Sequence, residues 1–187
     1  MSSPPPVHVL GFAGSLRKGS FNRALLRAAH DQLPDGLTLE DFDIAPIPLY
    51  NGDVEAAGIP PSVEDFRTKI RAADAILIVT PEYNYSIPGV LKNAIDWASR
   101  PPDRPFNDKP VAIMGASPGG FGTLLSQHHL RQTFVFMNMH PLMNPQLYVS
   151  KAGDKFDAEG RLTDEDTKKR IKALLEGLRD WTLRLRI

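Results

Sequence analysis

Short apolar runs and longer amphipathic segments alternate along the chain. Five apolar runs have the length of β-strands, and in the segments between them apolar residues recur every three to four positions, as on one face of a helix. The runs start at Val7, Leu37, Ala75, Val111 and Gln146. This alternation predicts a parallel sheet with helices on both faces, joined by right-handed crossovers.

Local signals predict most of the boundaries. The second to fifth strands are expected over Leu37–Phe42, Ala75–Val79, Val111–Met114 and Gln146–Ser150. Helices are expected over Phe21–Leu33, Val90–Ser99 and Thr123–Met137. A further helix is expected to end near Ala73, and the last helix is expected along an apolar stripe that includes Ile171. Capping boxes are expected at residues 62–65 and 163–166. The proline- and glycine-rich stretch Asp43–Pro61 is expected to be a long loop without regular structure.

The length of 187 residues fits one domain, residues 1–187, with residues 1–6 as an unstructured tail. The N-terminus lacks the basic and apolar segments of a secretory signal, and the most apolar stretch, Ala72–Val79, is too short to span a bilayer. We therefore expect a cytoplasmic protein.

Charge and cysteine content limit the classes of function that the protein can have. There are 22 basic and 22 acidic residues, so the balanced charge gives no indication of binding to nucleic acid or to a membrane surface. There is no cysteine, which excludes disulfides, thiolate catalysis and thiolate metal sites. Any redox chemistry must therefore come from a cofactor.

The first strand runs into a segment of glycines, hydroxyls and cations, after which a helix begins at about Ser20. Unpaired N–H groups and the positive dipole end make a helix N-terminus a site for anions. Glycines at positions 11, 14 and 19 are expected to allow backbone conformations that turn amides toward one point. The side chains expected to add donors are Ser15, Arg17, Ser20 and Asn22.

The spacing of this segment matches neither G-x-x-x-x-G-K-[ST] nor G-x-G-x-x-G. The predicted ligand is therefore a monophosphate rather than a pyrophosphate or a triphosphate. An ordinary strand-to-helix turn, in which glycine and serine serve only tightness and capping, fits the segment equally well.

Two further strands end in loops with unusual residues, Thr80–Ser86 and Gly115–Thr123. In open parallel sheets, ligands bind outside the carboxyl ends of the strands, near the point where strand order reverses. With the order 2-1-3-4-5, the loops after strands one, three and four meet at that edge. We expect them to form one site.

Together these loops resemble the NADPH-dependent FMN reductase family, a flavodoxin-like group that includes chromate and quinone reductases. The matching segments are Gly14–Arg17 with Ser20 and Asn22, Pro81–Asn84 with Ser86–Gly89, Leu91–Trp97, and Ser117–Gly122. The match runs from about Val7 to beyond Leu142. The resemblance implies a flavodoxin-like three-layer sandwich with a five-stranded parallel sheet, bound FMN, and NADPH or NADH as electron donor.

By position, the resemblance assigns a part of FMN to each loop. The phosphate ligands that it implies are Ser15, Arg17, Ser20 and Asn22. The residues implied to lie along the flavin ring, largely through backbone amides, are Pro81, Glu82, Tyr83 and Asn84. Those implied to face the pyrimidine edge of the ring are Ser117, Gly119, Gly120 and Phe121.

The implied activity is hydride transfer from NADPH or NADH to FMN and then to a small acceptor, which can be a quinone, chromate, an azo compound or free flavin. No side chain is assigned as catalytic, because the cofactor carries the chemistry, and no metal site is expected. A flavodoxin-like single-electron carrier between protein partners is the alternative. Such a carrier would gain from a strongly acidic surface, whereas this chain is neutral.

The resemblance also implies a homodimer or homotetramer. For Tyr50 and Asn51, in the long second loop, two interpretations stay open. They reach over the flavin of a neighbouring subunit, or they belong to a plain surface loop. A scaffold whose FMN only reports redox state also stays open.

Overall fold

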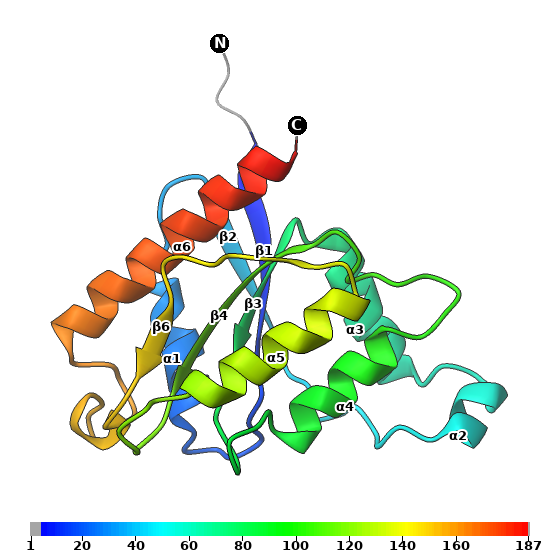
Figure 1. The fold of residues 1–187 in the computed structure, drawn as a ribbon, viewed down its shortest axis with the longest axis horizontal. Helices are drawn as coiled ribbons and strands as arrows, with labels where there is room; N and C mark the ends of the chain where they lie inside the picture. Colours follow the sequence, from blue (N-terminus) through cyan, green and yellow to red (C-terminus); the bar gives the residue numbers. More distant parts are fainter. Residues whose placement is uncertain (1–4, 187) are drawn as a thin grey trace.

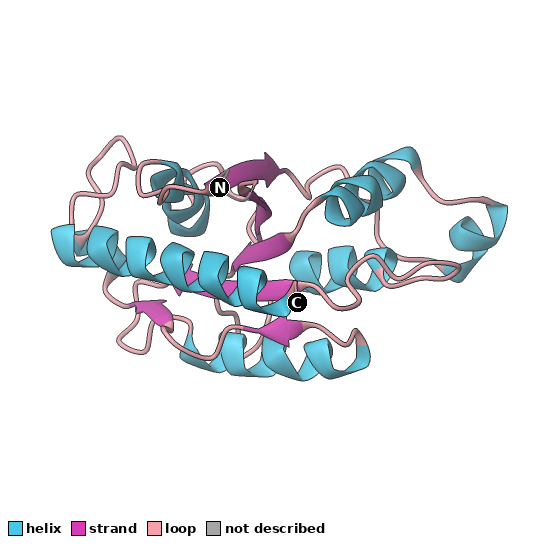
Figure 2. Ribbon diagram, turned by 90° about the horizontal axis from the view of Figure 1, so that it is seen from above, coloured by secondary structure: helices cyan, strands magenta, loops and turns pink. Residues whose placement is uncertain are grey.

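The computed structural model describes residues 5–186, which form a central sheet with helices on both sides (Figures 1 and 2). The first strands are β1 (Val7–Ala13), β2 (Leu37–Phe42), β3 (Ala75–Val79) and β4 (Pro110–Ala116). All pairs are parallel, and the order is β2-β1-β3-β4-β5. The predicted flavodoxin-like fold and strand order are confirmed.

The fifth position of the sheet differs in detail from the prediction. Two short strands share it: β5 (His140–Pro141) pairs with the start of β4, and β6 (Leu147–Val149) pairs with its end. Prolines at positions 141 and 145 have no N–H to donate to a ladder, so pairing is interrupted between them. The single strand expected over Gln146–Ser150 is therefore only the second of two pieces.

Two apolar cores lie on opposite faces of the sheet. Helices α1 (Phe21–His30) and α6 (Glu165–Leu185) cover one face. Helices α3 (Pro61–Ala72), α4 (Gly89–Ala98) and α5 (Leu124–Phe136) cover the other. Every residue of β3 is buried between these layers, which explains its continuous apolar sequence. None of the helices in the described part of the chain is long and apolar enough to cross a bilayer.

The long second loop is not wholly irregular, because it contains the short helix α2 (Gly52–Ala57). None of the residues in α2 is buried, so the sequence carries no apolar periodicity that would predict it. The side chain of Asn51 caps α2 by accepting a hydrogen bond from the backbone N–H of Asp53 at 2.9 Å. Figures 1 and 2 show α2 projecting from the body of the molecule beyond α3 and α4.

One predicted capping box is wrong and the other contains the true cap. Helix α3 begins at Pro61 with Pro60 as its N-cap, and the hydroxyl of Ser62 instead donates to the carbonyl of Pro46 at 3.0 Å. At α6, Asp164 is the N-cap and accepts from the backbone N–H of Thr167 at 2.8 Å. A short 3₁₀ helix, η1 (Ala152–Asp154), precedes α6.

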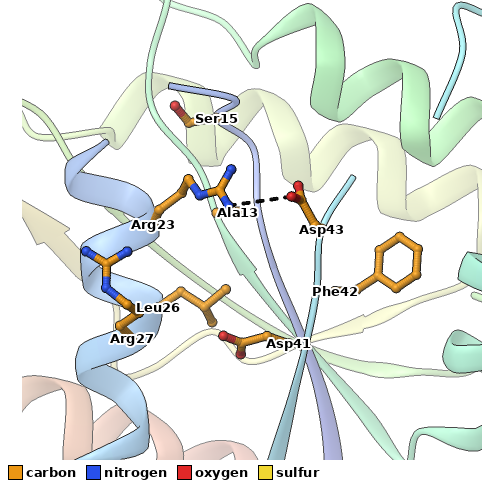
Figure 3. A pocket seen from close by; sticks show the side chains of 8 residues that line it. All are labelled: Ala13, Ser15, Arg23, Leu26, Arg27, Asp41, Phe42 and Asp43. Atoms are coloured by element: carbon orange, nitrogen blue, oxygen red, sulfur yellow. Dashed lines mark ion pairs between the residues drawn. The ribbon is translucent and has the colours of Figure 1, made fainter. Parts of the chain in front are cut away.

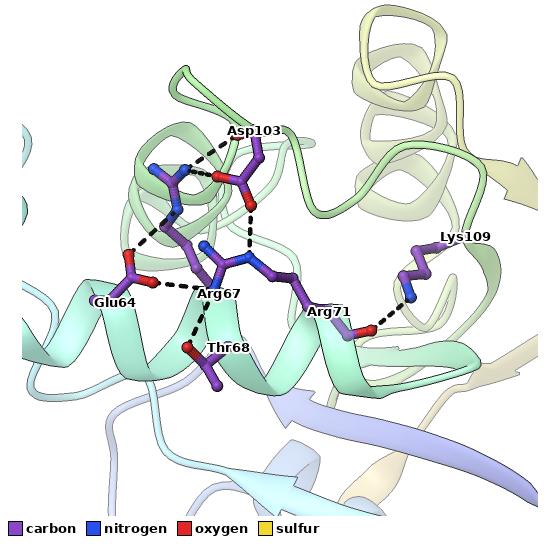
Figure 4. Close-up of polar contacts among 6 residues, drawn as sticks. All are labelled: Glu64, Arg67, Thr68, Arg71, Asp103 and Lys109. Carbon is purple, nitrogen blue, oxygen red and sulfur yellow. Dashed lines mark hydrogen bonds and ion pairs between the residues drawn. The ribbon is translucent and has the colours of Figure 1, made fainter.

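A charged cluster fixes the proline-rich segment between α4 and β4 (Figure 4). Arg67 of α3 is fully buried and donates to both the carboxylate and the carbonyl of Asp103. Arg71 donates to the second carboxylate oxygen at 2.5 Å and to Glu64 at 3.0 Å. Hydrogen bonds from Arg71 and Arg67 lower the pKa of Asp103 to about 2.

This cluster predicts a loss of stability in acid. A carboxyl whose pKa is lowered by folding contributes stability above its unfolded pKa of about 4, and the contribution is lost as the pH falls through the folded pKa. The difference in unfolding free energy between wild type and Asp103→Asn should therefore be constant between about pH 5 and 8 and shrink between about pH 4 and 2. Urea denaturation across this range measures it. A difference that stays constant down to pH 3 would contradict the assignment of the cluster.

Candidate active site

The loops after β1, β3 and β4 meet at the carboxyl edge of the sheet, at the bottom of Figure 1. They enclose an open pocket of about 370 Å³. The predicted convergence of the three loops is therefore present. The residues that line the pocket are Ser15, Arg17, Ser20, Phe21, Asn22, Pro81, Glu82, Tyr83, Ala116, Ser117 and Pro118.

The first loop presents the N-terminus of α1 to this pocket. Ser20 is the N-cap, and its hydroxyl accepts from the backbone N–H groups of Asn22 at 3.2 Å and Arg23 at 3.4 Å. Ser15 is buried, whereas Arg17 is exposed and folds back to donate to the carbonyl of Gly19 at 2.7 Å. The loop thus gathers a helix end, two hydroxyls and one guanidinium.

Two of the three glycines in β1 and the first loop act through packing, which corrects the expected conformational role. Positions 11, 14 and 19 are not among the glycines with positive φ. A Cβ on Gly14 would lie 3.0 Å from Leu91 of α4, and one on Gly11 would lie 2.8 Å from Leu26 of α1. Gly19 has open space around it. Two of the three glycines therefore allow the helices to lie close to β1.

Asn22 ties α1 to the end of β4. Its side-chain amide donates to the carbonyl of Ala116 at 2.9 Å and accepts from the N–H of the same residue at 2.8 Å. The side chain is buried. An asparagine amide has two N–H donors, and Ala116 takes one of them.

Replacing Asn22 by alanine should destabilise the fold. The substitution leaves the N–H and C=O of Ala116 buried without their partner, so we expect a loss of about 3 kcal/mol in the free energy of unfolding. Asn22→Asp keeps an acceptor for the N–H, but its second carboxylate oxygen would face the carbonyl of Ala116 in a buried site, so a loss at least as large is expected. Guanidinium denaturation measures both. An alanine variant within about 0.5 kcal/mol of wild type would refute this role.

The second loop ends in a tight turn with unusual backbone angles. Tyr83 and Ser86 exchange backbone hydrogen bonds of 3.1 and 2.9 Å. The two residues between them, Asn84 and Tyr85, have φ of 52° and 62°, as in a type I′ turn. Positive φ is costly for a tyrosine, so the surrounding contacts must hold this turn in place.

Helix α5 supplies those contacts. The hydroxyl of Ser126 donates to the carbonyl of Pro81 at 3.0 Å, and its backbone N–H donates to the carboxylate of Glu82 at 3.0 Å. One helical turn later, Nδ1 of His129 lies 2.7 Å from the hydroxyl of Ser86. The start of α5 therefore holds both ends of the second loop.

The third loop is fixed by the end of β6 and the segment that follows it. The N–H of Ser117 donates to the carbonyl of Val149 at 2.9 Å, and the N–H of Lys151 donates to the carbonyl of Gly119 at 3.1 Å. A Cβ on Gly120 would meet nothing within 4 Å, and the Phe121 side chain is 72% exposed. The tip of this loop is therefore open to solvent.

A smaller pocket of about 210 Å³ lies beside the first, between α1 and β2 (Figure 3). Ser15 lines both pockets. Arg23 of α1 points toward Asp43 across this space and forms an ion pair of 3.5 Å. Arg17 is thus the cation that lines the main pocket, while Arg23 lines the smaller pocket and is paired with Asp43.

Comparison with known proteins identifies the family. The sequence profile of the NADPH-dependent FMN reductases matches residues 7–154. The chain belongs to this family. The resemblance that the three loops carry is therefore confirmed.

Relatives of the chain in this family are similar over nearly their whole length. An NAD(P)H-dependent FMN reductase of Pseudomonas aeruginosa is 57% identical over 96% of this chain and 97% of its own. An NADPH:quinone oxidoreductase of Arabidopsis thaliana is 50% identical over 97% of this chain and 94% of its own. The flavoenzyme NAD(P)H:(acceptor) oxidoreductase FerB of Paracoccus denitrificans superimposes with a TM-score of 0.86 at 35% identity, over 95% of this chain and 98% of its own.

Most residues that the family resemblance singles out line the pocket. Those that do so are Ser15, Arg17, Ser20, Asn22, Pro81, Glu82, Tyr83 and Ser117. Those beside it, in the second turn and at the tip of the third loop, are Asn84, Gly119, Gly120 and Phe121. Three lining residues were not predicted as site residues: Phe21 and Ala116, at the ends of α1 and β4, and Pro118 in the third loop. Only their position next to predicted ligands could have indicated them.

Proposed function

We propose that this protein is an FMN-dependent NAD(P)H oxidoreductase that passes two electrons to a small acceptor such as a quinone. The observation that carries the proposal is that the three family loops meet in one pocket. The first of these loops has hydrogen-bond donors suited to a phosphate. The names of the relatives, which are FMN and quinone reductases, support the same activity.

The chemistry of the pocket fits FMN. A phosphate dianion needs N–H and O–H donors and positive charge, and the first loop offers a helix N-terminus, Ser15 and Arg17. The volume of about 370 Å³ lies within the range of about 300–1,000 Å³ that is common for small-molecule sites. The open tip at Gly120 leaves room for a ring beside the backbone.

Bound FMN would supply the transfer of two electrons from NAD(P)H to the acceptor. The residues of the chain then bind and orient the FMN. Ser15, Arg17 and Ser20 hold the phosphate, and Asn22 sets the position of α1 through Ala116. The second and third loops hold the ring with groups fixed before binding, which lowers the entropy cost of ordering them.

The acceptor that we propose is a quinone, because several relatives are named for quinones. The experiment is to measure NADPH and NADH oxidation by the purified, FMN-loaded protein with a benzoquinone, chromate, an azo dye and free flavin. We expect the quinone to give the highest kcat/KM. A protein that carries FMN but oxidises neither nucleotide with any acceptor would contradict the proposal and favour a single-electron carrier.

A cytoplasmic location stays a prediction.

We also propose that the protein is a homodimer or homotetramer in which a second subunit packs against the outer face of α5. On this helix Val135 and Phe136 are 83% and 62% exposed, while the polar Ser126 and Gln127 are fully buried. Two adjacent, strongly exposed apolar side chains on a helix are typical of an interface. A second copy is the partner that we propose.

Charges on this face should separate the subunits. We expect Val135→Asp with Phe136→Asp to lower the mass measured by light scattering to that of one chain, because each carboxylate would be buried without a partner at the interface. Circular dichroism should be unchanged, since neither side chain belongs to the core. A wild-type protein with the mass of one chain would contradict the proposal.

A further inference from the structure

Glu82 occupies an unusual place between the pocket and α5. It is half-buried, it lines the main pocket, and its Oε2 accepts from the backbone N–H of Ser126 in the first turn of α5. Thr123, the N-cap of α5, makes no side-chain capping bond, and the first turn contains no acidic residue. The N-terminus of α5 is therefore capped by a carboxylate from a different loop.

The negative charge of Glu82 is held by this helix end and not by a cation. Within residues 5–186, no lysine, arginine or histidine forms an ion pair with Glu82. The positive end of a helix dipole favours a carboxylate at this position. Glu82 and Arg17 are the acidic and the basic side chain among the lining residues, and they come from different loops.

We propose that Glu82 sets the reduction potential of the bound flavin, an inference that rests on the proposed function. Hydride transfer from NAD(P)H carries two electrons and one proton, so NAD(P)⁺ leaves and the ring gains one net negative charge. A fixed carboxylate in the wall of a partly desolvated pocket opposes that added charge. Glu82 thereby lowers the midpoint potential and makes the reduced protein a stronger donor to its acceptor.

The capping bond allows charge and structure to be tested separately. Glu82→Gln keeps an oxygen acceptor for the N–H of Ser126 and keeps the size of the side chain, but it removes the charge. Glu82→Ala removes both. Glu176→Gln, on α6 and outside the pocket, is the control for loss of one carboxylate.

The experiment is a spectroscopic redox titration of the FMN-loaded proteins with a reference dye. We expect Glu82→Gln to retain FMN and to raise the midpoint potential by about 30 mV, a tenfold change in the two-electron equilibrium constant. Its melting temperature should fall only slightly, because the helix end loses the charge that its dipole favours but keeps the capping bond, whereas Glu82→Ala should raise the potential similarly and melt lower still. Glu176→Gln should leave the potential unchanged.

Three results would overturn the inference. Equal potentials in wild type and Glu82→Gln, both loaded with FMN, would overturn it while leaving the proposed function intact. A rise in Glu82→Ala without a rise in Glu82→Gln would mean that the capping bond, and not the charge, sets the potential. Failure of the wild type to bind FMN would overturn the proposed function and this inference together.

Discussion

Replacing Gly115 by alanine should cost about 3 kcal/mol of folding free energy or more, the upper end of what overpacking usually costs. A Cβ at this position would lie 2.2 Å from both the carbonyl oxygen of Thr80 and the hydroxyl oxygen of Thr123. The first belongs to the backbone at the end of β3 and the second to the N-cap of α5. The carbonyl of Thr80 cannot move aside without displacing the backbone that follows β3, and rotation of the Thr123 side chain would not relieve the clash, because the Cβ of Thr123 would itself lie 3.0 Å from the new atom.

A neighbouring glycine provides the control for this prediction. In Gly119→Ala the new Cβ would meet only the hydroxyl of Ser117, at an ordinary contact distance of 3.5 Å. We expect its free energy of unfolding in guanidinium to lie within about 0.5 kcal/mol of wild type. If Gly115→Ala were equally stable, the close packing of β4 against Thr80 and Thr123 would be wrong.

Replacing Arg17 by alanine should weaken FMN binding roughly 10- to 150-fold, the equivalent of about 1.5–3 kcal/mol for a hydrogen bond to a charged group. Arg17 is the guanidinium that lines the pocket, and its hydrogen bond to the carbonyl of Gly19 fixes the side chain beside the N-terminus of α1. The fold should remain intact, because Arg17 is exposed and no other described residue depends on it for an ion pair.

The adjacent Lys18 is the matched control. It is also an exposed cation of the first loop, but it does not line the pocket. Lys18→Ala should therefore change FMN affinity less than twofold, by the loss of long-range attraction alone. Affinity is measured by the quenching of FMN fluorescence on titration with apoprotein. Equal affinities for wild type and Arg17→Ala would mean that the phosphate lies elsewhere.

The sequence allowed much of the sheet to be predicted, because a buried parallel strand such as β3 is continuously apolar and the edge strand β2, of which only Leu37 is buried, alternates. Leu37–Phe42 and Ala75–Val79 begin and end where the apolar pattern indicated. The short β5 and the exposed helix α2 could not be predicted in this way, since one has two residues and the other buries none. The periodicity of apolar residues indicates which positions are buried, and these two elements bury few side chains.

The sequence allowed the loops of the pocket to be predicted, but not the hydrogen bonds that hold these loops in place. The residues that follow β1, β3 and β4 carry the family motifs, and the strand order brings them together. The bond of Asn22 to Ala116 and that of Glu82 to Ser126 each join residues far apart in the chain. No local pattern indicates such pairs, because side chains of the same type at a loop could equally face solvent or ligand.

The central claim is that the three loops bind FMN with its phosphate at the N-terminus of α1. Parallel titrations of the apoprotein with FMN and with riboflavin, which lacks only the phosphate, test it most directly. We predict that FMN binds one molecule per chain and that riboflavin binds at least tenfold more weakly, since it cannot use Ser15, Arg17 or the helix end. Equal affinity for the two flavins, or no binding of either, would contradict the claim.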